Sequence, residues 1–158
     1  MLTTVNTSGL LVSRCMAVAD RENTVDLIFH THAESGKTDD IDNNSNVSVS
    51  FYKDSTGEWL SVSGKAELVT DRNVVEKYYS KSLKAWIGDK GDGVHDGGPG
   101  DPRIGIIRVK TSTVTYAVQT ATTIGKYIGI AKGIVTGEVP SINSIVEMAE
   151  KDIAAARK

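Results

Sequence analysis

Two neighbouring runs in the middle of the chain alternate between apolar and polar residues, and this alternation constrains the fold more than any other feature. The runs cover residues 46–52 and 59–70 and are separated by a short polar loop. A two-residue period is that of a β-strand with one buried face. Gly64 interrupts the apolar face of the second run. A glycine inside a strand often marks a sharp bend or a bulge. Consecutive long strands with such a bend are what a small closed barrel requires.

The rest of the chain fits the same architecture, beginning with a hairpin of two strands joined by a turn at residues 6–9. The order of the elements predicts a mainly β (α+β) fold, an antiparallel barrel with peripheral helices rather than a parallel βαβ sheet. The expected strands are residues 1–5, 10–18, 24–31, 46–52, 59–70 and 103–118. The expected helices are residues 35–43, a short helix capped by Asp71, a turn of helix at 82–86, and a final helix capped by Ser141 with Ile142, Ile145, Ala149 and Ile153 on one face.

Three segments between these elements lack a regular pattern. Residues 21–23 are expected to form a turn. Residues 88–102 are rich in Gly and Asp but lack the residue spacing and the closing Glu of calcium loops, so we expect an irregular surface loop. Residues 119–140 hold several glycines with little periodicity, which indicates an extension or arm and not an independent domain.

Composition narrows the class of protein further. The chain of 158 residues is long enough for one domain with a substantial core, and its net charge of −2 gives no basic surface for nucleic acid. A single cysteine, Cys15, excludes an internal disulfide and fits a reducing compartment. No apolar run approaches the roughly 20 residues that span a bilayer, and the N-terminus lacks the pattern of a secretory signal. We therefore expect a cytoplasmic protein without a membrane or nucleic-acid partner.

The stretch from Ile28 to Thr38 has the pattern of an anion-binding turn, in which a β-branched run is followed by the start of a helix. Free N–H groups and the positive end of the helix dipole favour an anion there, and Ser35 and Lys37 add a donor and a charge. A P-loop does not fit, because its first glycine would fall at Thr31 and Glu34 would place a carboxylate among the phosphates. This turn predicts a phosphate site of another kind.

Arg14 is a second candidate, because it projects among apolar neighbours on the face that it shares with Val12, Met16 and Val18. A guanidinium in that position needs an anion or a water-filled edge. It equally fits an arginine at the rim of a barrel that is paired with an acidic side chain. The residues alone leave these two alternatives open.

Other kinds of site have weaker support. No serine has the Gly-x-Ser-x-Gly context of a hydrolase, and Cys15 has no evident histidine partner. His30 and His32 share one face of an extended chain, but no third ligand accompanies them, so we expect no metal. The remaining polar groups are the carboxylates Asp39, Asp40 and Asp42, expected on a solvated helix face, and Asp92, His95 and Asp96, a candidate polar site in the loop.

Several segments resemble the FMN-binding split barrel, the superfamily that includes pyridoxamine 5′-phosphate oxidase. The segments are Val12–Met16, Phe29–Lys37, Asn44–Phe51 and Trp59–Val69. Within this superfamily the chain is similar to the general stress proteins and above all to their fungal blue-light-inducible branch. The runs Ser82–Asp89 and Gly91–Pro99 are particularly like that branch, and the similarity is weakest over residues 119–158.

The resemblance implies a split-barrel FMN-binding domain over residues 1–118, with residues 119–158 as a C-terminal extension and helix of the same domain. It also implies a homodimer with two FMN molecules at the subunit interface. The first strand begins almost at Met1, so we expect none of the N-terminal helix of longer relatives.

The family pattern assigns cofactor-binding positions. Arg14 matches an arginine near the phosphate, with Cys15 beside it, and Met16 lies along the flavin. By the same resemblance, His30 and Thr31 are expected to contact the flavin ring or the ribityl chain, largely through their backbones. The remaining positions are Ser35 and Lys37, which match the residues that grip the phosphate, Gly36 between them, and Trp59.

Two positions depart from the oxidase pattern: Gly36 replaces an arginine, and Trp59 replaces a glutamine that contacts the flavin. The oxidase's C-terminal arginine and histidine cluster is also missing, so we do not expect pyridoxamine oxidation. The main expectation is an FMN-dependent redox protein with an unknown small-molecule or electron-donor partner. The alternatives are a non-enzymatic flavin binder, as a sink or sensor in stress or light responses, and a heme or deazaflavin in the same cleft.

Overall fold

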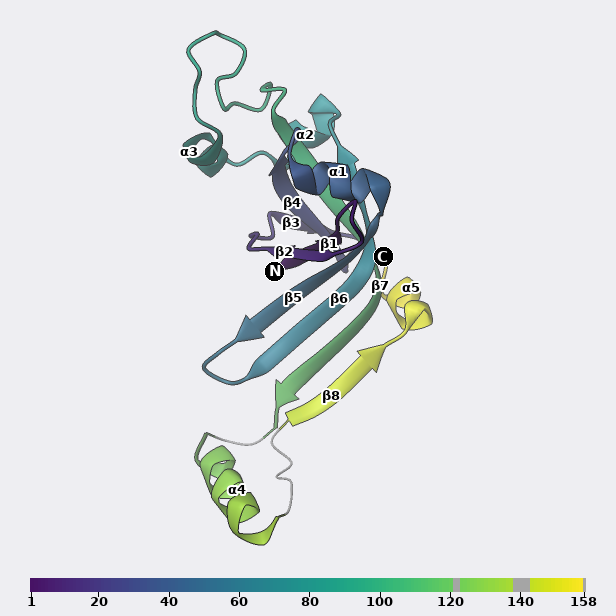
Figure 1. Ribbon diagram of the computed structural model, residues 1–158, viewed down its shortest axis with the longest axis vertical. Helices are drawn as coiled ribbons and strands as arrows, with labels where there is room; N and C mark the ends of the chain where they lie inside the picture. The colour runs from purple at the N-terminus through teal and green to yellow at the C-terminus, as the bar shows by residue number, and fades with distance from the viewer. Residues whose placement is uncertain (121–122, 138–142, 158) are drawn as a thin grey trace.

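The computed structural model describes residues 1–120, 123–137 and 143–157. They form one antiparallel eight-stranded sheet with helices at its periphery (Figure 1). The strands are β1 (Leu2–Val5), β2 (Leu11–Arg14), β3 (Asp20–Glu22), β4 (Asp26–His32), β5 (Asn46–Lys53), β6 (Glu58–Val69), β7 (Ile104–Gln119) and β8 (Asn143–Met148). The helices are α1 (Gly36–Asn43), α2 (Arg72–Tyr78), the 3₁₀ turn η1 (Lys81–Leu83), α3 (Lys84–Ile87), α4 (Thr123–Thr136) and α5 (Glu150–Ala156).

The sheet is organised around β7. Its strand order is β2-β1-β5-β6-β7-β4-β3, and β8 pairs with β7 outside this path. One edge of β7 pairs with β6 along most of its length. The other edge pairs with β4 over residues 104–109 and with β8 over residues 114–119. The strand is therefore shared between two regions of the sheet.

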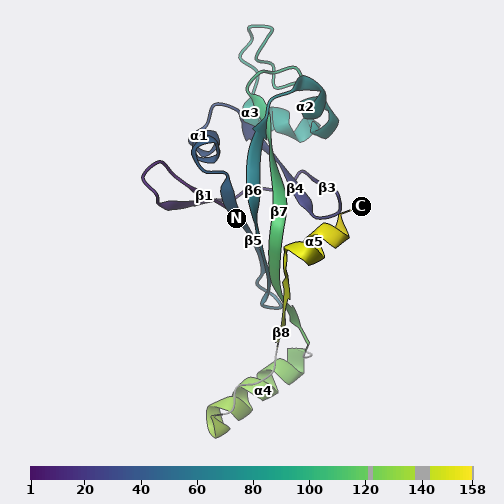
Figure 2. The same ribbon diagram turned by 90° about the vertical axis from the view of Figure 1, so that its right-hand side faces the viewer.

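This arrangement confirms the mainly β fold and the antiparallel split barrel with peripheral helices, but the sheet is not closed. β2 and β3 lie at the two ends of the path, and among the described residues neither pairs with the other. The first strands and the β3–β4 hairpin lie on opposite sides of β6 and β7 (Figure 2).

Gly64 forms the bulge that its position in the sequence predicts. The register between β6 and β7 shifts between Ser63 and Gly64. A Cβ atom at residue 64 would lie 2.3 Å from the carbonyl oxygen of Lys110, which is closer than any real contact. Only glycine allows the two backbones to approach in this way.

Two apolar clusters cover the two faces of the sheet. One joins Ile41 of α1 to strand residues such as Phe29 and Val109. The other joins Val75 of α2 to Ile28, on the opposite face of β4. The expected N-cap is confirmed, because the Asp71 carboxylate accepts the N–H groups of residues 73 and 74.

Two boundaries near the start of the chain differ from the expectation. The second strand ends at Arg14 and not at residue 18, where pairing with the short β1 stops. The expected turn at 21–23 overlaps β3, and the reversal falls at Asn23 and Thr24, which both have positive φ. These two residues form the turn of the β3–β4 hairpin. The strand expected from residue 24 therefore begins at Asp26.

The C-terminal part differs more. Residues 123–136 form the helix α4, which extends beyond the ends of β7 and β8 (Figures 1 and 2). The expected final helix is wrong between 143 and 148, because this segment pairs with β7 as β8, and α5 begins only at Glu150. Ser141 and Ile142, the expected start of that helix, lie outside the described residues. No helix in the described ranges has the length and hydropathy to cross a membrane.

Candidate functional site

The turn before α1 is held by a buried hydroxyl. The Thr38 Oγ1 lies 2.8 Å from the Ala33 carbonyl oxygen and 2.6 Å from that of Ser35, and it accepts the N–H of Ser35. The Ala33 N–H donates to the carbonyl of Arg103 at 2.7 Å, which ties the turn to the start of β7. Ser35 is the N-cap of α1. These bonds fix the orientation of the first helical N–H groups.

Lys37 and Ser35 are brought together at this helix terminus, as the sequence predicts. The Lys37 ammonium donates to the Ser35 hydroxyl at 2.8 Å. Burial and the nearby charge of Arg14 lower the pKa of Lys37 below its usual value. Among the residues that the structure describes, no carboxylate lies within ion-pair distance of Lys37. Within these described ranges, the ammonium group thus has the Ser35 hydroxyl as a partner but no carboxylate.

Gly36 leaves the space above this terminus open. A Cβ atom built at residue 36 would meet no atom within 4 Å. The position is exposed at the first residue of α1. An anion can approach the helix N-terminus from this side.

Arg14 is paired with an acidic side chain, which is one of the two alternatives that the sequence leaves open. Its guanidinium lies 2.9 Å from the Asp40 carboxylate and donates to the Thr4 hydroxyl at 2.7 Å. The Thr4 hydroxyl donates to the same carboxylate at 2.8 Å. The expected solvated face is therefore wrong for Asp40, which is 6% exposed, although Asp39 and Asp42 are exposed.

One of the two cations beside the turn has no carboxylate partner among the described residues. Arg14 and Lys37 are close enough for the first to lower the pKa of the second, and Asp40 neutralises one of them. Two cationic groups, a hydroxyl and a helix N-terminus are the groups that bind phosphate in proteins. The chemistry of the described residues thus fits a phosphate ester.

His30 and Thr31 lie next to each other on β4 but face opposite sides of the sheet. Thr31 is buried on the same side as Phe29. The His30 Nε2 atom is 2.6 Å from the Tyr78 carbonyl at the end of α2. The His30 side chain is thereby directed away from α1, which leaves its backbone as the part that could meet a ligand at the turn.

The two positions that follow Arg14 differ in environment. Cys15 is exposed and not bonded to another cysteine, and Met16 is half-buried against the core cluster of Phe29. Both lie just beyond the end of β2. The structure therefore leaves Cys15 at the surface and packs Met16 against the core.

Trp59 is the candidate that the structure does not bring to the turn. It pairs with Ala117 near the end of β7, whereas Thr31 pairs with Gly105 near the start of the same strand. Twelve positions separate the two partners, which corresponds to roughly 40 Å of strand at about 3.3 Å per residue. Trp59 instead lines a shallow apolar hollow of about 340 Å³ with Phe51, Tyr52 and other residues of β6 and β7.

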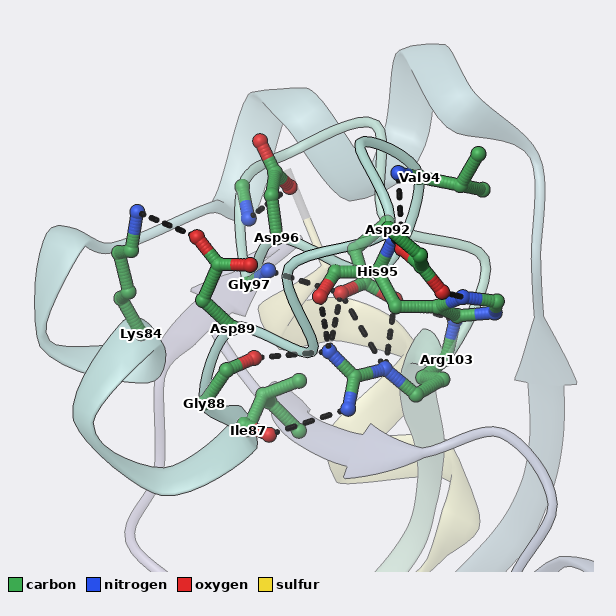
Figure 3. A network of polar contacts seen from close by, with 12 residues as sticks. Lys84, Ile87, Gly88, Asp89, Asp92, Val94, His95, Asp96, Gly97 and Arg103 are labelled. Atoms are coloured by element: carbon green, nitrogen blue, oxygen red, sulfur yellow. Dashed lines mark hydrogen bonds and ion pairs between the residues drawn. The ribbon is translucent and has the colours of Figure 1, made fainter.

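The Gly- and Asp-rich loop is irregular, as expected, but it is built around a buried ion pair that the sequence analysis missed. The Arg103 guanidinium contacts the Asp101 carboxylate at 2.6 Å and donates to the carbonyls of Ile87, Gly88 and His95 (Figure 3). Asp101 is fully buried. Arg103 lies just before β7, which begins at Ile104 and not at residue 103 as expected.

The candidate polar site in this loop is only partly assembled. Asp92 and His95 are paired at 2.6 Å, and Asp96 accepts the N–H of Gly98 instead (Figure 3). Within the described ranges, no three His, Cys, Asp or Glu side chains are grouped so that they could hold a metal.

Asp40 and Thr4 are the site residues that the sequence analysis missed. Thr4 shares the buried face of β1 with Leu2, and a polar side chain at such an inward position is a usable signal. Asp40 carries no such signal, because the nearby Asp39 and Asp42 are the same residue type and yet are exposed.

The chain is similar in sequence to a known protein family and to a curated fungal protein. Residues 1–141 match the family described as pyridoxamine 5′-phosphate oxidase like. The chain is 49% identical over 158 residues to the protein bli-3 of Neurospora crassa, a match that covers 99% of this chain and 76% of that protein.

Two solved structures have a similar fold. A Clostridium acetobutylicum protein related to general stress protein 26 aligns with a TM-score of 0.68 and 12% identity, covering 97% of this chain and 86% of that one. A Nostoc punctiforme protein, described as pyridoxamine 5′-phosphate oxidase-related and FMN binding, aligns with a TM-score of 0.59 and 18% identity, covering 73% and 71%. At these identities the structural matches establish the fold.

Proposed function

The chain belongs to the pyridoxamine 5′-phosphate oxidase-like family, and on this basis we propose that it binds FMN and acts as a flavin-dependent redox protein. The family membership confirms the resemblance to the general stress and blue-light-inducible proteins stated from the sequence. The observation that carries the proposal is the ammonium group of Lys37, which is half-buried beside Arg14 without a carboxylate of its own among the described residues. A phosphate group supplies the missing counter-ion.

Each candidate residue has a role that follows from its position. The Ser35 hydroxyl and the Lys37 ammonium bind the phosphate at the N-terminus of α1, and Arg14 faces it from the end of β2. When bound, a flavin supplies the hydride or electron transfer, while the protein supplies position and polarity. Thr31, through its backbone, and Met16 line the path from the phosphate toward the ring.

We also propose that the working unit is a homodimer with the flavin between subunits. The separation of Trp59 from the turn along β7 supports this proposal, because Trp59 of one copy can then complete the site of the other. The apolar hollow around Trp59 is a surface that a second copy can cover. Residues 1–118 form the FMN-binding domain in this proposal, and residues 119–158 are its extension.

The cofactor is tested by purifying the protein, recording its spectrum and identifying the released molecule by mass. We expect flavin absorption bands and the mass of FMN. A heme or deazaflavin spectrum, or the absence of any bound cofactor after reconstitution with FMN, contradicts the proposal.

The phosphate contacts are tested with Ser35→Ala and Lys37→Ala. Each should weaken FMN at least about tenfold, because charge-assisted hydrogen bonds contribute roughly 1.5–3 kcal/mol. Riboflavin, which lacks the phosphate, should bind as it does to the wild type. Lys90→Ala, which removes an exposed loop lysine, is the control, and equal weakening of both ligands would show that the phosphate lies elsewhere.

Redox activity is separated from simple flavin binding by stopped-flow mixing of the FMN-loaded protein with NADH or NADPH. Bleaching of the flavin band supports the redox function. A bound flavin that no such donor reduces favours the alternative, a flavin-binding sink or sensor in stress or light responses.

A further inference from the structure

A second hollow, of about 520 Å³, lies on the side of the sheet that faces away from α1. It is lined by the outward-facing residues of β6 and β7, by the β3–β4 hairpin and by Arg157 after α5. The alternation of β7 places Arg108 and Lys110 on this side and the core residue Val109 on the other. The hollow is thus distinct from the proposed flavin site.

Every carboxylate that lines the hollow is already bound to a guanidinium. Glu22 and Glu67 contact Arg108 at 2.8 and 2.7 Å. Asp26 contacts Arg157 at 2.9 Å. Hydrogen bonds from Tyr78 and Arg108 lower the pKa of Glu22, so this carboxylate remains charged. Glu22 also contacts the Lys77 ammonium at 3.4 Å, and none of the three acids lies within ion-pair distance of Lys65 or Lys110.

Two lysines in the hollow have no such partner. Lys65 of β6 and Lys110 of β7 are directly opposite each other across the two strands. Within the described part of the chain, neither has a carboxylate at ion-pair distance. Like charges in directly opposed positions destabilise a sheet. The bulge at Gly64 sets this register, because it shifts the pairing immediately before Lys65.

We propose that this hollow binds a phosphate group between the ammonium groups of Lys65 and Lys110. A doubly charged anion turns their mutual repulsion into two attractions and matches their combined charge. Ser45 also lines the hollow, and a serine hydroxyl can donate to an anion. The volume suits a small phosphorylated molecule or the free ion.

The test measures binding of inorganic phosphate to the full chain by ³¹P NMR, at constant ionic strength and with saturating FMN present. Lys65→Gln combined with Lys110→Gln should weaken phosphate binding at least about tenfold. The control combines Lys53→Gln with Lys90→Gln, which removes two exposed lysines outside the hollow and should leave binding unchanged. Equal weakening in both double variants would show general surface attraction and overturn the proposal.

Lys110→Glu keeps the test independent of folding defects. This change places opposite charges across the strands, so it should raise the melting temperature without phosphate and abolish any further rise with phosphate. A phosphate response that survives Lys110→Glu but is lost in Lys37→Ala would assign the response to the α1 turn and overturn the proposal.

The source of the phosphate group is resolved by comparing inorganic phosphate with glycerol 3-phosphate. Tighter binding of the ester identifies a phosphorylated ligand, and equal binding identifies the free ion. Binding of neither contradicts the proposal, and this outcome leaves the proposed FMN function unaffected because the two sites lie on different faces.

Discussion

At the scale of single residues, the position of Arg14 depends on two neighbours that do not themselves face the proposed ligand. Asp40 and Thr4 bind its guanidinium from one side and bind each other. Arg14 also donates to the Val12 carbonyl at 3.4 Å, and its charge is near enough to Lys37 to lower the pKa of that lysine. We infer that Asp40 and Thr4 are positioning residues for the proposed phosphate site.

Asp40→Asn should destabilise the fold by about 1–3 kcal/mol, because it removes the charge from a buried hydrogen-bonded pair. It should also weaken FMN more than riboflavin if Asp40 orients Arg14. Denaturant unfolding and the two binding constants measure both effects. Asp39→Asn, on the exposed side of the same helix, is the control, and an equal loss of the two ligands would reduce Asp40 to a structural role.

The proximity of Ser35 and Lys37 could be predicted because both lie within one turn of the start of α1. Local spacing is enough for that prediction. The burial of Asp40 depends instead on β1 and β2, which are distant in the sequence. No local pattern distinguishes it from Asp39, so the residue that orients Arg14 could be found only from the fold.

At the scale of elements, the loop from Gly88 to Arg103 shows how an irregular segment can still have a core. The guanidinium of Arg103 donates hydrogen bonds to three backbone carbonyl groups of the loop and of α3, which have no partner strand there among the described residues. Asp101 holds that guanidinium and accepts the N–H of Gly97. The loop should therefore be ordered only while this ion pair is intact.

Asp101→Asn should lower the free energy of unfolding by about 3 kcal/mol near neutral pH, as expected for a broken buried pair. Chemical denaturation measures this loss. Asp96→Asn, in the same loop but exposed, should have little effect. If both variants were equally stable, the ion pair would not hold the loop.

The same ion pair predicts a pH dependence. Hydrogen bonds from Arg103 hold the pKa of Asp101 well below its ordinary value of 3.8. The stabilisation is therefore complete above that value and is lost as the pH falls below it, because the unfolded chain then binds the proton more readily. Between about pH 7 and pH 3 the difference between wild type and Asp101→Asn should narrow by roughly 1 kcal/mol. An unchanged difference would contradict the assignment.

The elements that could be predicted are those with their own periodicity. β5 and β6 alternate along their length, and Gly64 marks the bulge where a side chain is missing. The sequence does not predict α4, because each of its glycines lowers helix propensity by about 1 kcal/mol. β8 was assigned to a helix because its strand conformation comes from pairing with the free edge of β7, which is a tertiary effect.

At the scale of the whole molecule, the proposed site requires two chains. Lys37 and Trp59 then belong to different subunits of each complete site. A mixed dimer of Lys37→Ala and Trp59→Ala chains would contain one site with both wild-type residues and one with neither.

Mixing the two variants should therefore restore wild-type FMN affinity to one site of each mixed dimer. Titration with FMN after subunit exchange measures the fraction of tight sites, and each variant alone is the control. If the two residues acted within one chain, every site would keep one defect and no tight fraction would appear.

One edge of β7 is shared between β4 and β8, and the junction between these two strands affects how the sheet unfolds locally. Between the segments paired with β4 and β8, the Thr111 N–H is bound by the Asp26 carboxylate, and its carbonyl is bound by Arg157. Side chains thus replace a strand partner at the point where two parts of the sheet meet. Such a junction separates cooperative units of local unfolding. Undocking of α5 would then free the Thr111 carbonyl first, whereas the Thr111 N–H would keep its protection from hydrogen exchange until Asp26 and β4 separate from β7.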